Sequence, residues 1–177
     1  MVVSRWAARA AAASTVCVAL AALPGAASAD TAAFDDPMGD STSVDVSRVR
    51  VVHAHAVKVS VRSAVPLDVG QVYTFWIDSG RGRRPTYAVE LRANSDFGGR
   101  LAVVESFGQR PSRFVACPGM RAHADMFDDE PVSVRIPRSC LRGPRRVRVA
   151  VKFVDETTGS VDWVPERRTF GPWVLGG

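Results

Sequence analysis

The sequence predicts an all-β protein, an antiparallel β-sandwich of the jelly-roll or immunoglobulin-like kind. Three observations predict it. Apolar and polar residues alternate in short runs along most of the chain. Segments rich in Gly, Pro, Asp and Asn separate these runs, as turns between strands do. No segment after residue 29 keeps a helical period, so two packed sheets are favoured over an architecture that contains helices.

The first half of the chain supplies four expected strands. In residues 44–52 (VDVSRVRVV) the apolar residues occupy even-numbered positions at first (Val44, Val46) and odd-numbered positions later (Val49, Val51). A β-bulge near residues 47–48 is therefore expected. Residues 57–62 (VKVSVR) alternate valine with polar side chains. Residues 72–78 (VYTFWID) and 86–91 (TYAVEL) also alternate, and each ends at a turn signal.

The second half supplies four more. Residues 100–107 (RLAVVESF) and 113–117 (RFVAC) are short candidates, whereas 132–136 (VSVRI) and 147–153 (VRVAVKF) alternate strictly, with one buried and one wet face. The insertion at 118–131 (PGMRAHADMFDDEP) is long enough to carry a short helical segment, which we expect as the one exception to the β architecture.

Residues 1–29 resemble a cleavable signal peptide. Arg5 and Arg9 provide the positive region, an apolar stretch follows at 10–23, and the sequence ASA ends at Ala29. The apolar stretch is too short to span a bilayer comfortably. We therefore expect a Sec-type export signal that is cleaved after Ala29, a secreted extracellular protein, and no membrane span in what remains.

Cleavage leaves an extended acidic segment at 30–43 and a single β-sandwich domain at 44–177. The full chain has 23 Lys and Arg against 18 Asp and Glu, a formal charge of +5, and removing the signal lowers this further. Nucleic-acid binding is favoured by a larger charge and by basic clusters interleaved with aromatic residues. The composition therefore argues against a nucleic-acid partner.

Two cysteines remain after export, Cys117 and Cys140. Two cysteines in an exported domain usually pair, and the chain has no C-x-x-C motif that would indicate redox catalysis. We therefore expect a structural disulfide between them, which would anchor both ends of the insertion at 118–131.

Five motifs recur in the same order in a known group of proteins: DPMGD (36–40), DV (45–46), WID (76–78), IPRSCLRGP (136–144) and DWVP (162–165). In this order the chain resembles a family of small secreted β-sandwich proteins from high-GC Gram-positive bacteria. More distantly it is similar to DOMON-like and carbohydrate-binding jelly-roll modules, which bind haem or sugars. The resemblance implies a secreted sandwich and assigns no ligand residue.

Catalysis has little support in the sequence. No G-x-S-x-G motif is present, and neither cysteine is available as a nucleophile if the two pair. Many carboxylates could form a glycosidase pair, but the sequence gives no separation between them. We therefore predict a protein that is not an enzyme, and keep an extracellular hydrolase as the third alternative.

Exposed aromatic rings would indicate sugar binding, because a flat ring stacks on a pyranose face. Trp76 lies on the side of its strand opposite the expected core, and beside Tyr87 or Trp173 it could form a ligand platform. The same parity also allows Trp76 to lie in a second apolar layer, under the C-terminal segment 170–177.

Aspartates offer a candidate calcium site. Asp36, Asp40 and Asp45 lie close together in sequence, and Asp78 and Asp162 lie near the ends of other strands. Ca²⁺ takes six to eight oxygen ligands, several of them carboxylates. The spacing does not match an EF-hand, and Asp before Pro-x-Gly also forms turns and accepts backbone N–H bonds. The pattern favours the turn-forming role, so no cofactor is expected, and Ca²⁺ is the alternative for these aspartates.

A second metal hypothesis concerns copper. Met120, His123 and Met126 recur every three residues within the insertion, so a helical turn would bring their soft ligands together for Cu(I). Alternatively, the methionines pack the insertion against the sandwich while His123 faces water.

The sequence thus favours a secreted, non-catalytic sandwich that binds an extracellular or envelope ligand, with a glycan as candidate. A structural or protein-interaction module without a small ligand is the alternative. A binding protein is expected to show a concave face with exposed Trp or Tyr, and an interaction module a long exposed edge strand or apolar patch. The ligand's identity and the oligomeric state are left open.

Overall fold

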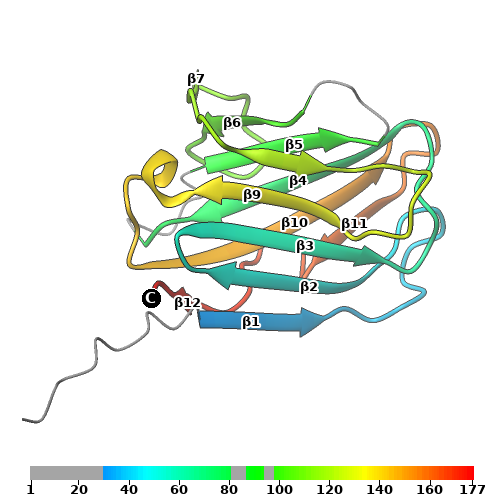
Figure 1. The fold of residues 1–177 in the computed structure, drawn as a ribbon. Helices are drawn as coiled ribbons and strands as arrows, with labels where there is room; N and C mark the ends of the chain where they lie inside the picture. Colours follow the sequence, from blue (N-terminus) through cyan, green and yellow to red (C-terminus); the bar gives the residue numbers. More distant parts are fainter. Residues whose placement is uncertain (1–29, 81–86, 94–97) are drawn as a thin grey trace, which may run out of the picture.

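The computed structural model describes residues 30–80, 87–93 and 98–177, which form two antiparallel sheets packed face to face (Figure 1). The predicted all-β sandwich is confirmed. The five-stranded sheet has the order β1 (Asp30–Asp35), β2 (Val46–His53), β3 (Ala56–Ser63), β9 (Val132–Pro137) and β8 (Arg121–His123). The second sheet has the order β11 (Val161–Val164), β10 (Arg146–Asp155), β4 (Gln71–Asp78), β5 (Tyr87–Arg92), β6 (Arg100–Val103) and β7 (Arg113–Phe114), with β12 (Val174–Leu175) also paired to β10.

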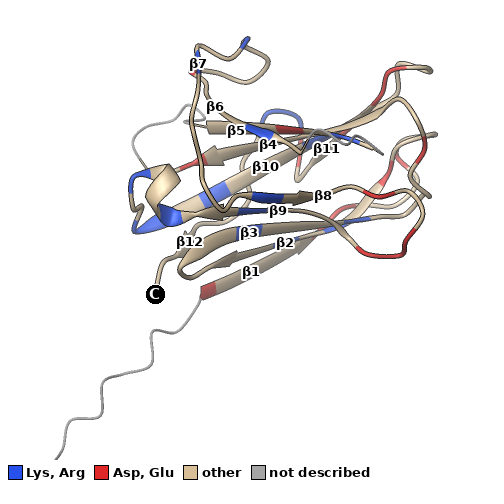
Figure 2. Cartoon of the chain, turned by 45° about the horizontal axis from the view of Figure 1, so that its top comes forward, with Lys and Arg blue, Asp and Glu red and all other residues tan. Residues whose placement is uncertain are grey.

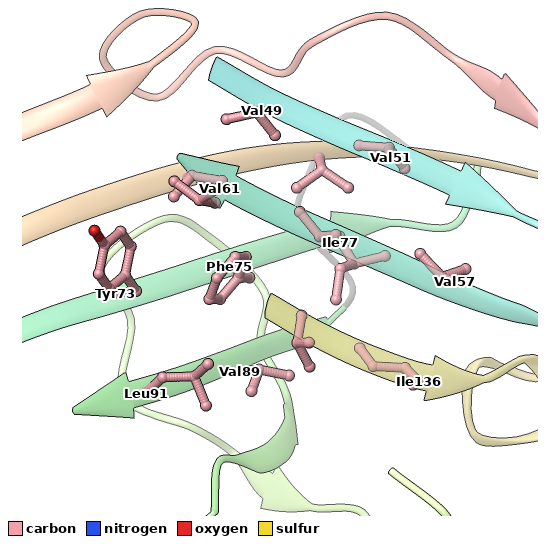
Figure 3. Packing of buried hydrophobic residues seen from close by; sticks show 14 of the residues in the cluster. Val49, Val51, Val57, Val61, Tyr73, Phe75, Ile77, Val89, Leu91 and Ile136 are labelled. Atoms are coloured by element: carbon pink, nitrogen blue, oxygen red, sulfur yellow. The ribbon is translucent and has the colours of Figure 1, made fainter. Parts of the chain in front are cut away.

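The core lies between the sheets and follows from the alternation within each strand. Tyr73, Phe75 and Ile77 of β4 are fully buried, and Figure 3 shows them facing valines of β2 and β3. Tyr73 also stacks on Phe153 of β10, with ring centroids 4.0 Å apart. Because burying one such side chain contributes about 1.5–3 kcal/mol, these inward positions fix which face of each strand points to the core.

The bulge expected in β2 is confirmed. Val46 pairs with Ser63 but Arg48 pairs with Arg62, so the register with β3 shifts by one residue. The shift lets apolar residues before and after it face the same core, because one extra residue reverses the alternation of faces. Val46 and Val49 are accordingly both fully buried.

The strands predicted at 44–52, 57–62, 72–78, 86–91, 132–136 and 147–153 all form, with bounds shifted by a few residues. The strand expected at 100–107 ends earlier, at Val103, because the following residues leave the sheet and cover its outer face with Phe107. The segment 30–43, expected ahead of the sandwich, contributes β1, which pairs with β2 and packs Ala32 and Phe34 against the core.

The helical turn expected within 118–131 is wrong. This insertion instead contains β8, which pairs with the edge of β9, and the residues around it form turns and bends. The physical reason is that pairing satisfies backbone groups that a single isolated helical turn would leave to water. The one helix among the described residues is η1 (Arg138–Leu141), a short 3₁₀ turn directly after β9.

The predicted disulfide between Cys117 and Cys140 is confirmed, with Cα atoms 5.4 Å apart. Cys117 follows β7 of the second sheet, and Cys140 lies in η1 after β9 of the first. The bond therefore links the two sheets at one end of the sandwich, and such a bond is typical of an oxidising compartment.

The expected signal peptide at 1–29, with its cleavage after Ala29, lies outside the described residues. Within the part of the chain that the structure does describe, no helix has the length and apolar character needed to cross a membrane.

His53 at the end of β2 is buried, and we expect it to make the stability of the fold depend on pH. Its Nδ1 lies 3.2 Å from the carbonyl oxygen of Val174 and its Nε2 has no partner among the described residues. Burial lowers the pKa of this imidazole below its usual 6.5, and the hydrogen bond to Val174 offsets part of the shift. The unfolded chain therefore binds a proton near pH 6.5 that the folded chain does not bind.

Stability should consequently fall as the pH drops below about 6.5. Replacing His53 with Gln keeps a donor toward Val174 and removes the titration. Urea unfolding of both proteins between about pH 7.5 and about pH 5, a range that includes the usual His pKa, should show that the wild type loses more stability on acidification than the His53→Gln variant. Equal losses in the two proteins would contradict this assignment.

Candidate ligand groove and acidic cluster

An open groove of about 1040 Å³ runs across the outer face of the second sheet. Its floor comes from β4, β5, β6, β10 and β11, and its rim from the segments 108–111 and 167–168. The described residues that line it are Thr74, Trp76, Ala88, Glu90, Arg92, Gly98, Gly99, Arg100, Ala102, Val104, Gly108, Gln109, Arg110, Pro111, Phe114, Lys152, Val161, Trp163, Arg167 and Arg168.

The strand register explains which residues form the floor. Trp76 of β4 lies opposite Ala88 of β5 on one side and Ala150 of β10 on the other. These two methyl side chains leave room for the large indole ring on the outer face. One strand further along the sheet, Lys152 of β10 lies opposite Trp163 of β11. Four neighbouring strands thus place two tryptophans on the same outer face.

The aromatic residues form a second apolar cluster, separate from the main core. The rings of Trp76 and Trp163 stack with centroids 5.0 Å apart, and Phe107 packs edge-on against both. Phe170 completes the cluster, 5.0 Å from Phe107. Trp76 is only 4% exposed, whereas Trp163 is partly exposed, so Trp163 is the ring that the groove presents to a ligand.

The lining of the groove is strongly basic. Among the described lining residues, six side chains are basic and one, Glu90, is acidic. Arg92 forms a bidentate pair with Glu156, at 2.7 and 3.2 Å, and this interaction raises the pKa of the guanidinium. Arg100 lies over the ring of Phe114, at 3.9 Å from its centroid. The basic lining residues are Arg92, Arg100, Arg110, Lys152, Arg167 and Arg168.

The three aromatic residues expected to form a platform do not meet. Trp76 lies in the groove floor but is buried in the second apolar layer, as the alternative interpretation allowed. Tyr87 lies opposite Ile77 and points into the main core. Trp173 lies under the guanidinium groups of Arg146 and Arg148 and does not line the groove.

A cluster of aspartates lies beside the groove, at the end of the sandwich where acidic loop residues gather (Figure 2). One carboxylate oxygen each from Asp36, Asp40 and Asp162 lie within 4.8 Å of one another. Asp45 lies next to them, and its Oδ2 accepts a 2.7 Å hydrogen bond from the Gly39 amide. The adjoining cavity of about 400 Å³ is also lined by Trp163, so it borders the groove.

Burial and mutual repulsion disturb the titration of this cluster. Desolvation raises the pKa of Asp36 to about 7, with further contributions from the charges of Asp162, Asp40 and Asp45. Desolvation also raises the pKa of Asp162, although the hydrogen bond that its carboxylate accepts from the Val46 amide acts in the opposite direction. Without a balancing cation, the site therefore favours a partly protonated form.

Asp78, the fourth aspartate of the expected calcium set, lies elsewhere. Strand β4 begins near the acidic cluster, where the Gln71 side chain donates a hydrogen bond to the carbonyl oxygen of Ser43. Asp78 is the last residue of the same strand, about 23 Å from Gln71 at the usual rise per residue of a strand. Its side chain is fully buried and pairs with Arg148, which donates from Nε at 2.9 Å and from Nη2 at 2.8 Å. The other oxygen of Asp78 accepts a bond from the Gly80 amide.

The helical turn that was expected to bring the three candidate copper ligands together does not form, because their segment contains β8 and bends. Met120 packs against the main core, and His123 ends β8, where its Nε2 lies 3.2 Å from the Asp128 carboxylate. Met126 lies in the bend that follows. Among the described residues, His123 belongs to no group of three or more His, Cys, Asp and Glu side chains close enough to share a metal ion.

Sequence reasoning missed most of the groove. Trp163 and Phe107 were not expected to join Trp76, because the register between β10 and β11 and the path of segment 104–112 cannot be read from alternation. Phe170, by contrast, belongs to the C-terminal segment that the second interpretation placed over Trp76. The alternation of apolar and polar residues in the strand at 147–153 was the other available indication, because it places Lys152 on the outer face of that strand.

Comparisons with protein-family models, with curated proteins and with solved structures gave no match. The class that the described residues define is therefore structural: an all-β, two-sheet sandwich with a basic, aromatic-floored groove on one outer face.

Proposed function

We propose that this protein is a secreted, non-catalytic binding protein that holds an acidic polysaccharide in the groove on its second sheet. The observation that carries the proposal is the composition of that groove. One partly exposed indole, Trp163, lies in the floor, and six basic side chains line the groove against one acidic side chain.

Each part of the groove suits one part of such a ligand. An indole face packs against the apolar face of a sugar ring, and Trp163 is held in position by its stack on Trp76. Guanidinium groups bind carboxylates or sulfates with paired hydrogen bonds. Because the groove is open and crosses several strands, it can accommodate a segment of an extended polymer.

The surface supports this proposal better than the interaction-module alternative. A module that adheres through a sheet edge needs a long unpaired strand. Among the described strands, three of the four edges are short, since β7 has two residues, β8 three and β11 four, and the fourth, β1, has six.

The hydrolase alternative depends on the aspartates beside the groove. A glycosidase needs two carboxyl groups that flank the bond to be cleaved. Asp36 and Asp162 are 8% and 4% exposed, and Asp162 already accepts the Val46 amide. These carboxylates are thus held by the fold more than they are presented to a polymer in the groove.

The proposal predicts selective binding of polyanionic sugars. Calorimetric titration with polygalacturonate should show binding, whereas neutral dextran should show none. Replacing Arg110 and Arg168, both exposed on the rim, with Glu should weaken binding at least about tenfold, which corresponds to about 1.4 kcal/mol.

The matched control reverses the same charge elsewhere. Arg62 and Arg135 are exposed on the five-stranded sheet, away from the groove, and their replacement with Glu should leave the affinity within about threefold. Equal losses in the two double variants would reduce the interaction to general charge attraction and overturn the proposal. Tighter binding of a single-stranded oligonucleotide than of polygalacturonate would also overturn it, in favour of nucleic acid.

A further inference from the structure

We propose that Asp36, Asp40 and Asp162 bind a divalent calcium ion that fastens the segment after β1 to strand β11. The three carboxylates come from two parts of the chain that are more than a hundred residues apart. Asp36 directly follows β1, Asp40 lies in the turn after it, and Asp162 is the second residue of β11. Their nearest oxygens lie within 4.8 Å of one another, a distance at which ionised carboxylates repel one another and at which a cation between them would remove the repulsion.

Unpartnered oxygens provide the second, independent observation. Asp36 is more than nine-tenths buried, and its Oδ2 has no hydrogen-bond partner among the described residues. The same holds for Asp45 and its Oδ1. A buried acceptor without a partner costs free energy, so each such atom in a folded protein calls for an explanation such as a bound water molecule or an ion. Two of them lie together here, in or next to a cluster of like charges.

Turn formation and capping account for only part of the cluster. The Gly39 amide bonds to Oδ2 of Asp45, and the Val46 amide bonds to Oδ2 of Asp162. These bonds explain one oxygen of each residue and the local path of the chain. They leave the buried oxygen of Asp36 unexplained, and they give no reason for the convergence of Asp36 and Asp40 on β11.

The chemistry of the donors selects the ion. The described cluster offers carboxylate oxygens and neither sulfur nor imidazole, a set that favours hard cations such as Ca²⁺, Mg²⁺ or Mn²⁺. Ca²⁺ tolerates irregular geometry, whereas Mg²⁺ requires a near-ideal octahedron. Three aspartates from a turn and a strand form an irregular set, and the adjoining cavity leaves room for water molecules to complete the six to eight ligands of Ca²⁺.

The proposed site has a direct link to the groove. Val161, Trp163 and Arg167 line both the cavity beside the aspartates and the groove itself. Asp162 lies between the first two of these residues on β11. An ion at Asp162 would therefore hold in place the strand that presents Trp163.

The first test is thermal unfolding of the full mature chain in EDTA, in CaCl₂ and in NaCl of matched ionic strength. At Ca²⁺ concentrations about a hundredfold above Kd, the melting temperature should rise by about 5 °C or more, and excess chelator should reverse the rise. MgCl₂ should give a smaller rise. An unchanged melting temperature in about 10 mM CaCl₂ would overturn the proposal, because even the weakest protein calcium sites have dissociation constants of about 1 mM. An equal rise in NaCl would also overturn it.

The second test uses Tb³⁺, whose luminescence is sensitised when it binds near an indole such as Trp163. Excitation of the protein should produce Tb³⁺ emission that Ca²⁺ competes away. The Asp40→Asn variant should abolish both the emission and the Ca²⁺ response while remaining folded, because Asp40 is exposed. The control variant Asp129→Asn, at an exposed acid outside the cluster, should behave as the wild type does. Emission that survives in Asp40→Asn would overturn the site.

Discussion

Replacing Arg148 with leucine should lower the free energy of unfolding by about 3 kcal/mol, the effect expected when one partner of a buried ion pair is removed. Asp78 is fully buried, and Arg148 donates to it from two nitrogens. The guanidinium also lies over the rings of Phe170 and Trp173, at 4.8 and 4.5 Å from their centroids. Leucine retains some apolar contact with those rings but leaves the Asp78 carboxylate without its counter-charge.

Urea unfolding of three variants would measure this effect. The double variant Arg148→Leu with Asp78→Asn should recover most of the lost stability. The asparagine side chain carries no charge, and its oxygen can still accept the hydrogen bond from the backbone N–H of Gly80. Arg62→Leu, an exposed arginine in the other sheet, should change the stability by less than about 0.5 kcal/mol. A loss for Arg148→Leu no larger than that of Arg62→Leu would show that the pair contributes nothing.

Removing the Cys117–Cys140 disulfide should cost about 3 kcal/mol. The bond closes a loop with a sequence separation of 23 residues, and the chain-entropy relation gives about 3–4 kcal/mol for this length. Much of the total stability of a domain of this size, about 5–15 kcal/mol, would therefore be lost. Replacing both cysteines with alanine avoids adding a hydroxyl at Cys140, which is 9% exposed.

Guanidinium unfolding in the presence and absence of a reductant separates this effect from side-chain packing. The wild type with reductant should approach the double alanine variant, and reductant should not change that variant. If reductant left the wild-type midpoint unchanged after full reduction, the disulfide would not stabilise the domain.

The sequence was sufficient to predict the fold because alternation reports which face of a strand is buried. In β4, Tyr73, Phe75 and Ile77 are core residues at every second position, and the same alternation identified six of the longer strands. The parity change before Val49 was enough to place the bulge in β2. Short edge strands such as β8 were missed because three residues carry too little pattern to distinguish pairing from a helical turn.

The groove could not be predicted to the same extent. Alternation placed Trp76 on the outer face, but the residues around it depend on which strands are neighbours and in what register. Trp163 lies beside Trp76 because β4 pairs with β10 and β10 pairs with β11. Phe107 reaches it from a segment that leaves β6 and folds over the sheet. Neither relation leaves a periodic trace in the sequence.

The acidic cluster is an intermediate case. Asp36, Asp40 and Asp45 lie within ten residues, so their proximity could be expected from the sequence. Adding Asp162 required only that strand ends meet at the ends of a sandwich. The same reasoning also suggested Asp78, because it does not specify which of the two ends a given strand terminus reaches. Strand direction decides that, and Asp78 lies at the opposite end with Arg148.

The position of the disulfide has a consequence for proteolysis. The bond joins Cys117 to Cys140, so the residues between them, which include β8, the loop 124–131 and β9, form a covalently closed ring. The most accessible part of this ring is the loop, where Phe127 is 80% exposed and offers a recognition site to a protease. A single cut there opens the ring without releasing either fragment, because both remain joined through the sulfur atoms. Strand β9, which lies between β3 and β8, would keep its neighbours, and the nicked protein would separate into two chains only after reduction.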